Sequence, residues 1–199
     1  KVIKSGDESS YTGETTFDAG SEGEELWEDQ IESTYSDKAV DLVTLLDDSS
    51  GDLTNSDFAS AHNGKDLTTS TSAANNSVVY CVKGTGTVTA VNAKAADESA
   101  SSKGYITIQL DNYSGSAVTR IVVGPVISST SLRDYLDGVS LNDFKNTTEW
   151  SNISQSINEI MLNKVINNID IANIQGKKVS FVGCFTTSPT DPNAIDISA

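Results

Sequence analysis

Five residues between positions 133 and 146 have side chains suited to binding a polar ligand. They are Arg133, Asp134, Asn142, Asp143 and Asn146. An arginine near carboxylates and amides can form several hydrogen bonds to a polyol or to the backbone of a partner protein. The stretch is irregular and lies between a predicted strand and a predicted helix, where a rigid scaffold often carries binding groups. We therefore predict a ligand- or partner-binding site there.

The same residues also have a structural interpretation. Asp143 and Asn146 are of types that cap helices, and Arg133 can pair with Asp134 or Asp143. Such contacts would hold in place a segment that has few apolar anchors of its own. Both interpretations remain open at the level of the sequence.

Other motifs give little indication of catalysis. The single histidine, His62, lies in a connecting segment, and the chain has no nucleophile elbow, paired-acid motif or phosphate-binding glycine loop. The acidic run 47–52 contains groups that bind calcium, but it lacks the alternating spacing of an EF-hand loop and is interpreted as a solvated turn. We expect no enzymatic activity, no cofactor and no metal site.

The two cysteines, Cys81 and Cys184, have no CxxC spacing and no second histidine to complete a zinc site. Each occupies an outward position of its predicted strand, so the two can meet on one outer face. Two separate thiols beneath a covering helix and a disulfide bond are both compatible with this arrangement.

Charge and hydropathy limit the classes of partner. The 199 residues carry a net charge of −15, and most of the acidic residues lie before residue 67. This charge repels phosphate backbones and anionic membrane surfaces, so we expect no nucleic-acid partner. No apolar stretch is long enough to span a membrane, and 37% hydrophobic residues suffice for one modest core. We expect a monomer.

The stretch Val78–Asn92 predicts the central strand of the fold. Its even positions, ending at Ala90, form one apolar or small face, and Gly84 and Gly86 would let it bend. The other elements expected after it are strands over Tyr105–Leu110 and Val118–Val123, helical turns at Leu132–Leu136 and Leu141–Phe144, a helix over Glu149–Asn167, and strands over Lys177–Phe185 and Ala194–Ser198. This order predicts an α+β, mainly β fold, a five-stranded OB-fold-like Greek-key barrel with helix 149–167 between strands three and four. A small mixed α+β sandwich is the alternative.

An N-terminal helical appendage is expected to precede the barrel. We divide the chain into a flexible tether at 1–16, a helical appendage and linker at 17–76, and the barrel at 77–199. Helices are predicted over Phe17–Tyr35, with Trp27 as a packing anchor, and over Lys38–Asp47.

Several short runs together resemble a bacterial family of predicted periplasmic lipoproteins, known as domain of unknown function 2291. These runs are Phe17-Asp18-Ala19 with Trp27, Lys38-Ala39-Val40-Asp41-Leu42, Val82-Lys83-Gly84, Gly124-Pro125-Val126-Ile127, Leu132-Arg133-Asp134, Ser140-Leu141-Asn142-Asp143-Phe144 with Asn146, and Gly176-Lys177-Lys178-Val179-Ser180-Phe181.

The resemblance implies a periplasmic protein, lipid-anchored to the membrane through an acylated cysteine upstream of Lys1. It also implies association with sugar-type ABC import systems, beside whose genes family members lie. Three functions follow as expectations: a tethered binding or accessory protein for a transporter component or a small polar ligand, a structural or protein-interaction module of the cell envelope, and, least favoured, an uncharacterised enzyme.

Overall fold

The computed structural model describes residues 17–67, 77–94, 97–188 and 191–199. The predicted tether at 1–16 and most of the Ser/Thr/Ala-rich linker lie outside these residues. Within them, no helix is both long enough and apolar enough to cross a membrane.

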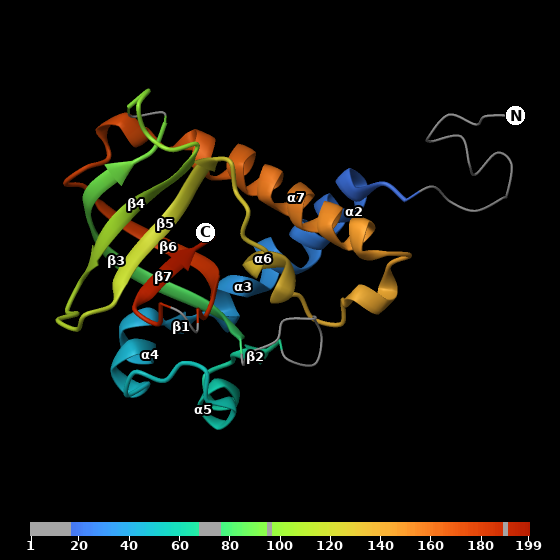
Figure 1. The fold of residues 1–199 in the computed structure, drawn as a ribbon, viewed down its shortest axis with the longest axis horizontal. Coiled ribbons are helices and arrows are strands. Elements are labelled where there is room, and N and C mark those ends of the chain that lie inside the picture. Colours follow the sequence, from blue (N-terminus) through green and yellow to red (C-terminus); the bar gives the residue numbers. More distant parts are fainter. Residues whose placement is uncertain (1–16, 68–76, 95–96, 189–190) are drawn as a thin grey trace, which may run out of the picture.

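The described residues contain one strongly curled sheet of seven strands, and five of these strands form the barrel (Figure 1). They are β3 (Val78–Asn92), β4 (Lys103–Leu110), β5 (Val118–Pro125), β6 (Lys178–Thr186) and β7 (Ala194–Ile197). β3 pairs antiparallel with β4 and β6, β4 pairs antiparallel with β5, and β5 pairs parallel with β7. A single antiparallel bridge between Cys184 and Ser198 joins β6 to the residue after β7. The predicted strand order, with a helix between the third and fourth strands, is confirmed.

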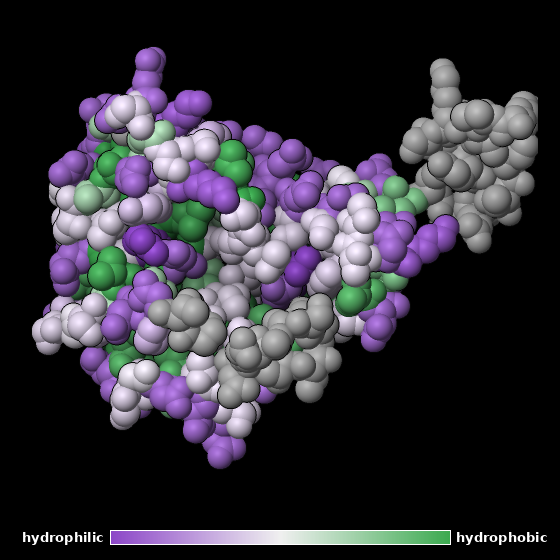
Figure 2. Space-filling view, in the orientation of Figure 1, coloured by the Kyte–Doolittle hydropathy of each residue, from purple (hydrophilic) through white to green (hydrophobic). Residues whose placement is uncertain are grey.

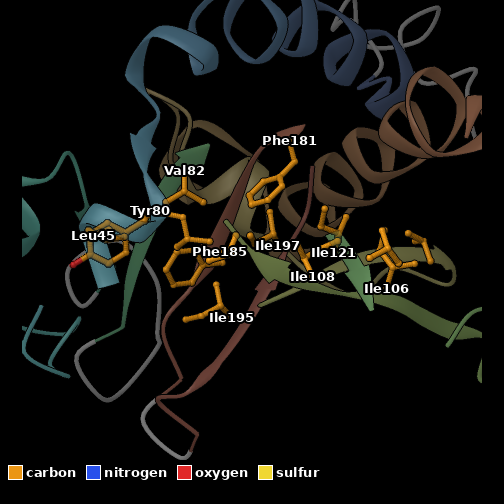
Figure 3. Packing of buried hydrophobic residues seen from close by; sticks show 14 of the residues in the cluster. Leu45, Tyr80, Val82, Ile106, Ile108, Ile121, Phe181, Phe185, Ile195 and Ile197 are labelled. Carbon is orange, nitrogen blue, oxygen red and sulfur yellow. The ribbon is translucent and has the colours of Figure 1, made fainter. Parts of the chain in front are cut away.

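The interior of this sheet is filled by the inward side chains of every strand. Figure 3 shows these side chains pointing toward one another. The labelled members that come from the five strands are Tyr80, Val82, Ile106, Ile108, Ile121, Phe181, Phe185, Ile195 and Ile197. The alternation of apolar residues that the sequence shows therefore marks the inner face.

Strand β3 bends so that it pairs on both sides. Its residues up to Thr87 pair with β6, and those from Gly86 onward pair with β4. A Cβ on Gly86 would lie 2.4 Å from the carbonyl oxygen of Gln109, so glycine permits the close approach of β4.

The register of β3 against β4 shifts between Val88 and Ala90. The prediction that Ala90 faces inward is wrong, because this bulge reverses the phase: Ala90 is exposed and Val91 packs on the core.

A layer of helices covers the outer face of β3 and β6. α2 (Ala19–Leu26), the π-helical turn η1 (Trp27–Glu32) and α3 (Ser33–Lys38) follow one another directly, where one helix was predicted. Trp27 is buried, as expected for a packing anchor. The apolar residues of these helices join outward residues of the strands in a second core, so the helical layer shares β3 with the barrel.

The second predicted helix begins later than expected. Val40–Asp41 is extended and pairs with β3 as the short strand β1, and α4 spans Leu42–Asp48. The prediction of a helix from Lys38 is wrong because Asp41 caps the helix, its carboxylate accepting from the backbone N–H of Thr44 at 2.9 Å. α5 (Ser56–Ala61) and the strand β2 (Lys65–Asp66) complete this part of the chain.

The segment between β5 and β6 contains the helical turns that the sequence predicts. α6 spans Ser131–Asp134, and η2 spans Leu141–Asp143. The long helix α7 spans Thr147–Lys164, two residues earlier at its start than predicted and three at its end. Two 3-10 turns follow it, η3 (Ile166–Asn168) and η4 (Ile171–Asn173).

Helices α2 and α7 run side by side in Figure 1, and a glycine lies at their contact. A Cβ on Gly23 would lie 2.2 Å from Oγ and 2.8 Å from Cβ of Ser156. We expect Gly23→Ala to lower the free energy of unfolding by about 1–3 kcal/mol through overpacking, although alanine is the better helix former. Urea unfolding measures this loss. The control, Glu24→Ala on the exposed side of α2, should stay within about 0.5 kcal/mol; equal stability of both variants would contradict the observed packing of α2 on α7.

Candidate functional site

The first two residues of the predicted site form a buried ion pair in α6. Both guanidinium nitrogens Nε and Nη2 of Arg133 donate to one carboxylate oxygen of Asp134, at 3.0 and 2.6 Å. The side chains are only 6% and 5% exposed. Arg133 also donates to the backbone oxygen of Trp150 at 3.1 Å and stacks on its ring, 4.1 Å from the centroid. The pair therefore fastens α6 to α7.

The carboxylate of Asp134 is satisfied from two sides. Its second oxygen accepts a hydrogen bond from the hydroxyl of Thr130 at 2.6 Å. With the guanidinium of Arg133 on the other oxygen, the buried charge is compensated, as a charge away from water requires.

Two more of the predicted residues cap local structure. The carboxylate of Asp143 accepts from the backbone N–H and the hydroxyl of Ser140, at 2.7 and 3.0 Å. Asn146 is the N-cap of α7, and its side-chain oxygen accepts from the backbone N–H of Glu149 at 2.9 Å. Asn142 is exposed. The five residues do not converge on one cavity, and four of them have partners within the chain.

A cleft with a mixed polar and apolar lining lies beside the segment that precedes Arg133 in the chain. It has a volume of about 450 Å³ and lies where the outer surface of β4, β5 and β7 meets the segment that leads into α6. We call it the hydroxyl cleft, and it is lined by Lys103, Gly104, Tyr105, Val122, Val126, Ser128, Ser129, Thr130, Ser131, Thr186 and Asp196. Figure 2 shows this face of the molecule, on which hydrophilic, intermediate and hydrophobic residues lie side by side around a central hollow.

An ion pair borders one side of the hydroxyl cleft. Arg120 of β5 and Asp196 of β7 are register neighbours, and the guanidinium donates to both carboxylate oxygens, at 2.5 and 2.9 Å. The hydrogen bond to Asp196 raises the pKa of Arg120. The guanidinium also lies over the ring of Tyr105, 4.8 Å from its centroid. Because Asp196 is half exposed, its carboxylate can still accept further hydrogen bonds from a ligand.

Hydroxyl groups line the opposite side. Ser129 donates to the hydroxyl of Ser131 at 3.1 Å, and the hydroxyls of Ser131 and Thr186 lie 2.9 Å apart. The long helix holds this segment, since Ser154 and Asn158 both donate to the backbone oxygen of Ser129. The cleft wall is thus fixed by α7 and β6 before any ligand arrives.

Sequence reasoning did not identify this cleft. Its lining comes from β4, β5, the segment after β5, β6 and β7, and only residues 128–131 of that lining are near the predicted site in the chain. The available signal was the alternation along the strands, since Tyr105, Arg120 and Asp196 are each next in sequence to an isoleucine that faces the core.

The remaining candidate residues have local contacts. His62 stacks on Phe58, with ring centroids 4.0 Å apart, and its Nδ1 lies 2.9 Å from the backbone oxygen of Phe58. Asp52, in the acidic run, accepts from the N–H and hydroxyl of Thr54, which lowers the pKa of its carboxyl. In the described part of the chain no three His, Cys, Asp or Glu residues are grouped as a metal site.

Cys81 and Cys184 lie opposite each other on β3 and β6, on the outer face as predicted. Both are buried free thiols. The disulfide alternative therefore stays a prediction at this point.

A family model and a solved structure relate the chain to known proteins. The family model described as predicted periplasmic lipoprotein (DUF2291) matches residues 1–198. Among solved structures, an OB-fold protein from Thermotoga maritima is similar, with a TM-score of 0.62 and 16% identity, over 92% of this chain and 95% of that chain. No curated protein matches. The structural likeness confirms the predicted OB-fold.

Alanine substitutions test which of the five predicted residues stabilise the fold. Arg133→Ala leaves Asp134 buried without its cation, so we expect a loss of more than about 1 kcal/mol, up to the 3–5 kcal/mol typical of a broken buried pair. Asn142→Ala, its control in the same segment, should cost less than about 0.5 kcal/mol. Chemical unfolding curves measure both. A stable Arg133→Ala variant would show that the pair does not hold α6 to α7.

Proposed function

Because the chain belongs to the family of predicted periplasmic lipoproteins, we propose that it is a lipid-anchored periplasmic binding protein that holds a small polyhydroxylated ligand, such as a sugar, in the hydroxyl cleft. The observation that carries the proposal is the convergence of Asp196, which is held by Arg120, and the hydroxyls of the 128–131 segment on one cleft. A polyol offers many donors and acceptors in a small volume, and such a lining can match them.

The size and place of the cleft support this function. A volume of about 450 Å³ is in the range of small-molecule sites. β4 and β5 are the second and third strands of the barrel, and OB-folds use that face to bind oligosaccharides and nucleic acids. This step is an analogy between folds. The net charge of −15 disfavours the nucleic acid.

The contacts favour binding over catalysis. The hydroxyls of the cleft bond to one another, while His62 contacts Phe58 and, at 3.6 Å, Asp48. A serine nucleophile needs an adjacent base to activate it. Among the described contacts of the cleft, no histidine is in that position.

We extend the proposal to an accessory role beside a sugar-type ABC importer. A tethered protein with a sugar site would raise the local concentration of ligand near the membrane, as linkage of two sites does in general. This extension follows from the resemblance and from the hydroxyl cleft together.

A protein-interaction module is the second candidate. It is favoured by a larger hollow of about 800 Å³ at the end of α7, where apolar residues such as Leu162 and Ile166 accompany the exposed Ile169. Such a partly apolar surface is compatible with contact to another protein.

Thermal-shift measurements with pentoses, hexoses and disaccharides test the sugar proposal. A sugar at about 100 times its Kd should raise the melting temperature by roughly 5–10 °C, since binding to the native state stabilises it by about 2.7 kcal/mol. Asp196→Asn should weaken binding of that sugar about tenfold, because a charge-assisted hydrogen bond is lost. The matched control is Asp111→Asn, which weakens the surface pair with Lys178 away from the cleft and should bind normally. Lack of any shift across the panel, or equal binding by both variants, would refute the proposed site.

A further inference from the structure

The two cysteines occupy a position from which they can form a covalent bond. Cys81 of β3 and Cys184 of β6 are directly opposite in an antiparallel pair. The backbone N–H of Cys184 donates to Ser198 at 2.8 Å, and its carbonyl accepts from the N–H of Ser198 at 2.9 Å. Both backbone groups of Cys184 therefore point toward Ser198 and away from β3.

It follows that Cys81 and Cys184 form a non-hydrogen-bonded pair of the ladder. Opposite residues of this kind have Cα atoms about 4.5 Å apart and side chains on the same face. This separation lies within the 4.4–6.8 Å that a disulfide spans, at roughly its lower end. The backbone need not move for the two sulfurs to bond.

The pair is closed off from solvent in largely apolar surroundings, and the Cys81 thiol donates to the backbone oxygen of Tyr35 at 3.4 Å. Cys81 and Cys184 are 1% and 0% exposed, in a core formed with Trp27, Ile31 and Tyr35 of the helical layer. Burial, together with the neighbouring thiol, raises the pKa of Cys184. In the folded protein both thiols are buried and therefore out of reach of reagents.

We propose that Cys81 and Cys184 are joined by a disulfide in the periplasm, where the family places the protein. The oxidant is a protein disulfide of that compartment. One cysteine thiolate attacks a sulfur of the oxidant to give a mixed disulfide, and the second thiolate attacks the first cysteine and displaces the oxidant as a dithiol. Two electrons and two protons pass from the cysteines to the oxidant.

Because the two cysteines are buried in the native state, their reaction with the oxidant has to take place earlier, during folding. A thiolate has to meet the oxidant, and the helical layer prevents this meeting in the native state. The bond therefore forms while β3 and β6 are paired and before the helices of residues 19–38 cover them. Once formed, it closes a loop of about 100 residues and constrains the unfolded chain.

Mass spectrometry of protein exported to a bacterial periplasm tests the bond. The protein is denatured with excess iodoacetamide and without reductant. We expect no carbamidomethyl group on either cysteine, and two such groups when reductant is added first. Two groups without reductant, or a small-thiol adduct on either cysteine, would overturn the proposal.

Thermal unfolding with and without reductant gives a second readout. Wild-type protein that is reduced in denaturant and refolded with reductant present should melt about 5–15 °C below the oxidised protein, the range expected for loss of one structural disulfide in a chain of this size. The control variants Cys81→Ala and Cys184→Ala should each be insensitive to reductant and should each take up one carbamidomethyl group. A wild-type melting temperature that reduction leaves unchanged would contradict the bond. If a variant fails to fold, the masses of the alkylated wild-type protein still decide whether the bond is present.

Discussion

Burial of β3 on both faces is the constraint on which the rest of the structure depends. Every residue from Val78 to Val82 is at most 1% exposed. An antiparallel sheet commonly exposes one face to water, so a strand buried on both needs a second layer. Tyr80 and Val82 fill the barrel, whereas Val79 and Cys81 require η1, α3, α6 and α7 as a cover. The N-terminal helices and the barrel therefore form one folded unit.

The buried pair Arg133–Asp134 serves this second layer. Removing two charges from water is costly, and a compensated pair is weak evidence for stability, but breaking one is strongly unfavourable. The guanidinium also contacts the ring and backbone of Trp150, which fixes α6 against the start of α7. Polar groups that look suited to a ligand in the sequence are used here to orient a short helix.

The hydroxyl cleft lies next to this ion pair. Thr130 and Ser131 begin α6 and line the cleft, so the ion pair that anchors α6 also positions two of the cleft hydroxyls. Lys103 lines the cleft and Arg120 pairs with its lining residue Asp196, so two cations lie at the cleft of a strongly acidic protein. Lys103 has no ion pair among the described residues. Local positive charge of this kind can orient an electronegative ligand even where the net charge is negative.

Short-range patterns in the sequence determined the elements. The alternation in β3, the apolar i, i+4 spacing in α7 and the cap at Asn146 are local, and each predicted its element to within a few residues. The same alternation placed Cys81 and Cys184 on one outer face.

Only the tertiary structure decided the bulge before Ala90, the pairing of Val40 with β3, and which polar groups are buried. These depend on contacts between distant segments: Arg133 is scaffold because Trp150 lies over it, and Asp196 lies in a cleft because β7 pairs with β5. The sequence of a segment shows its periodicity, but it does not show which other segment will bury it.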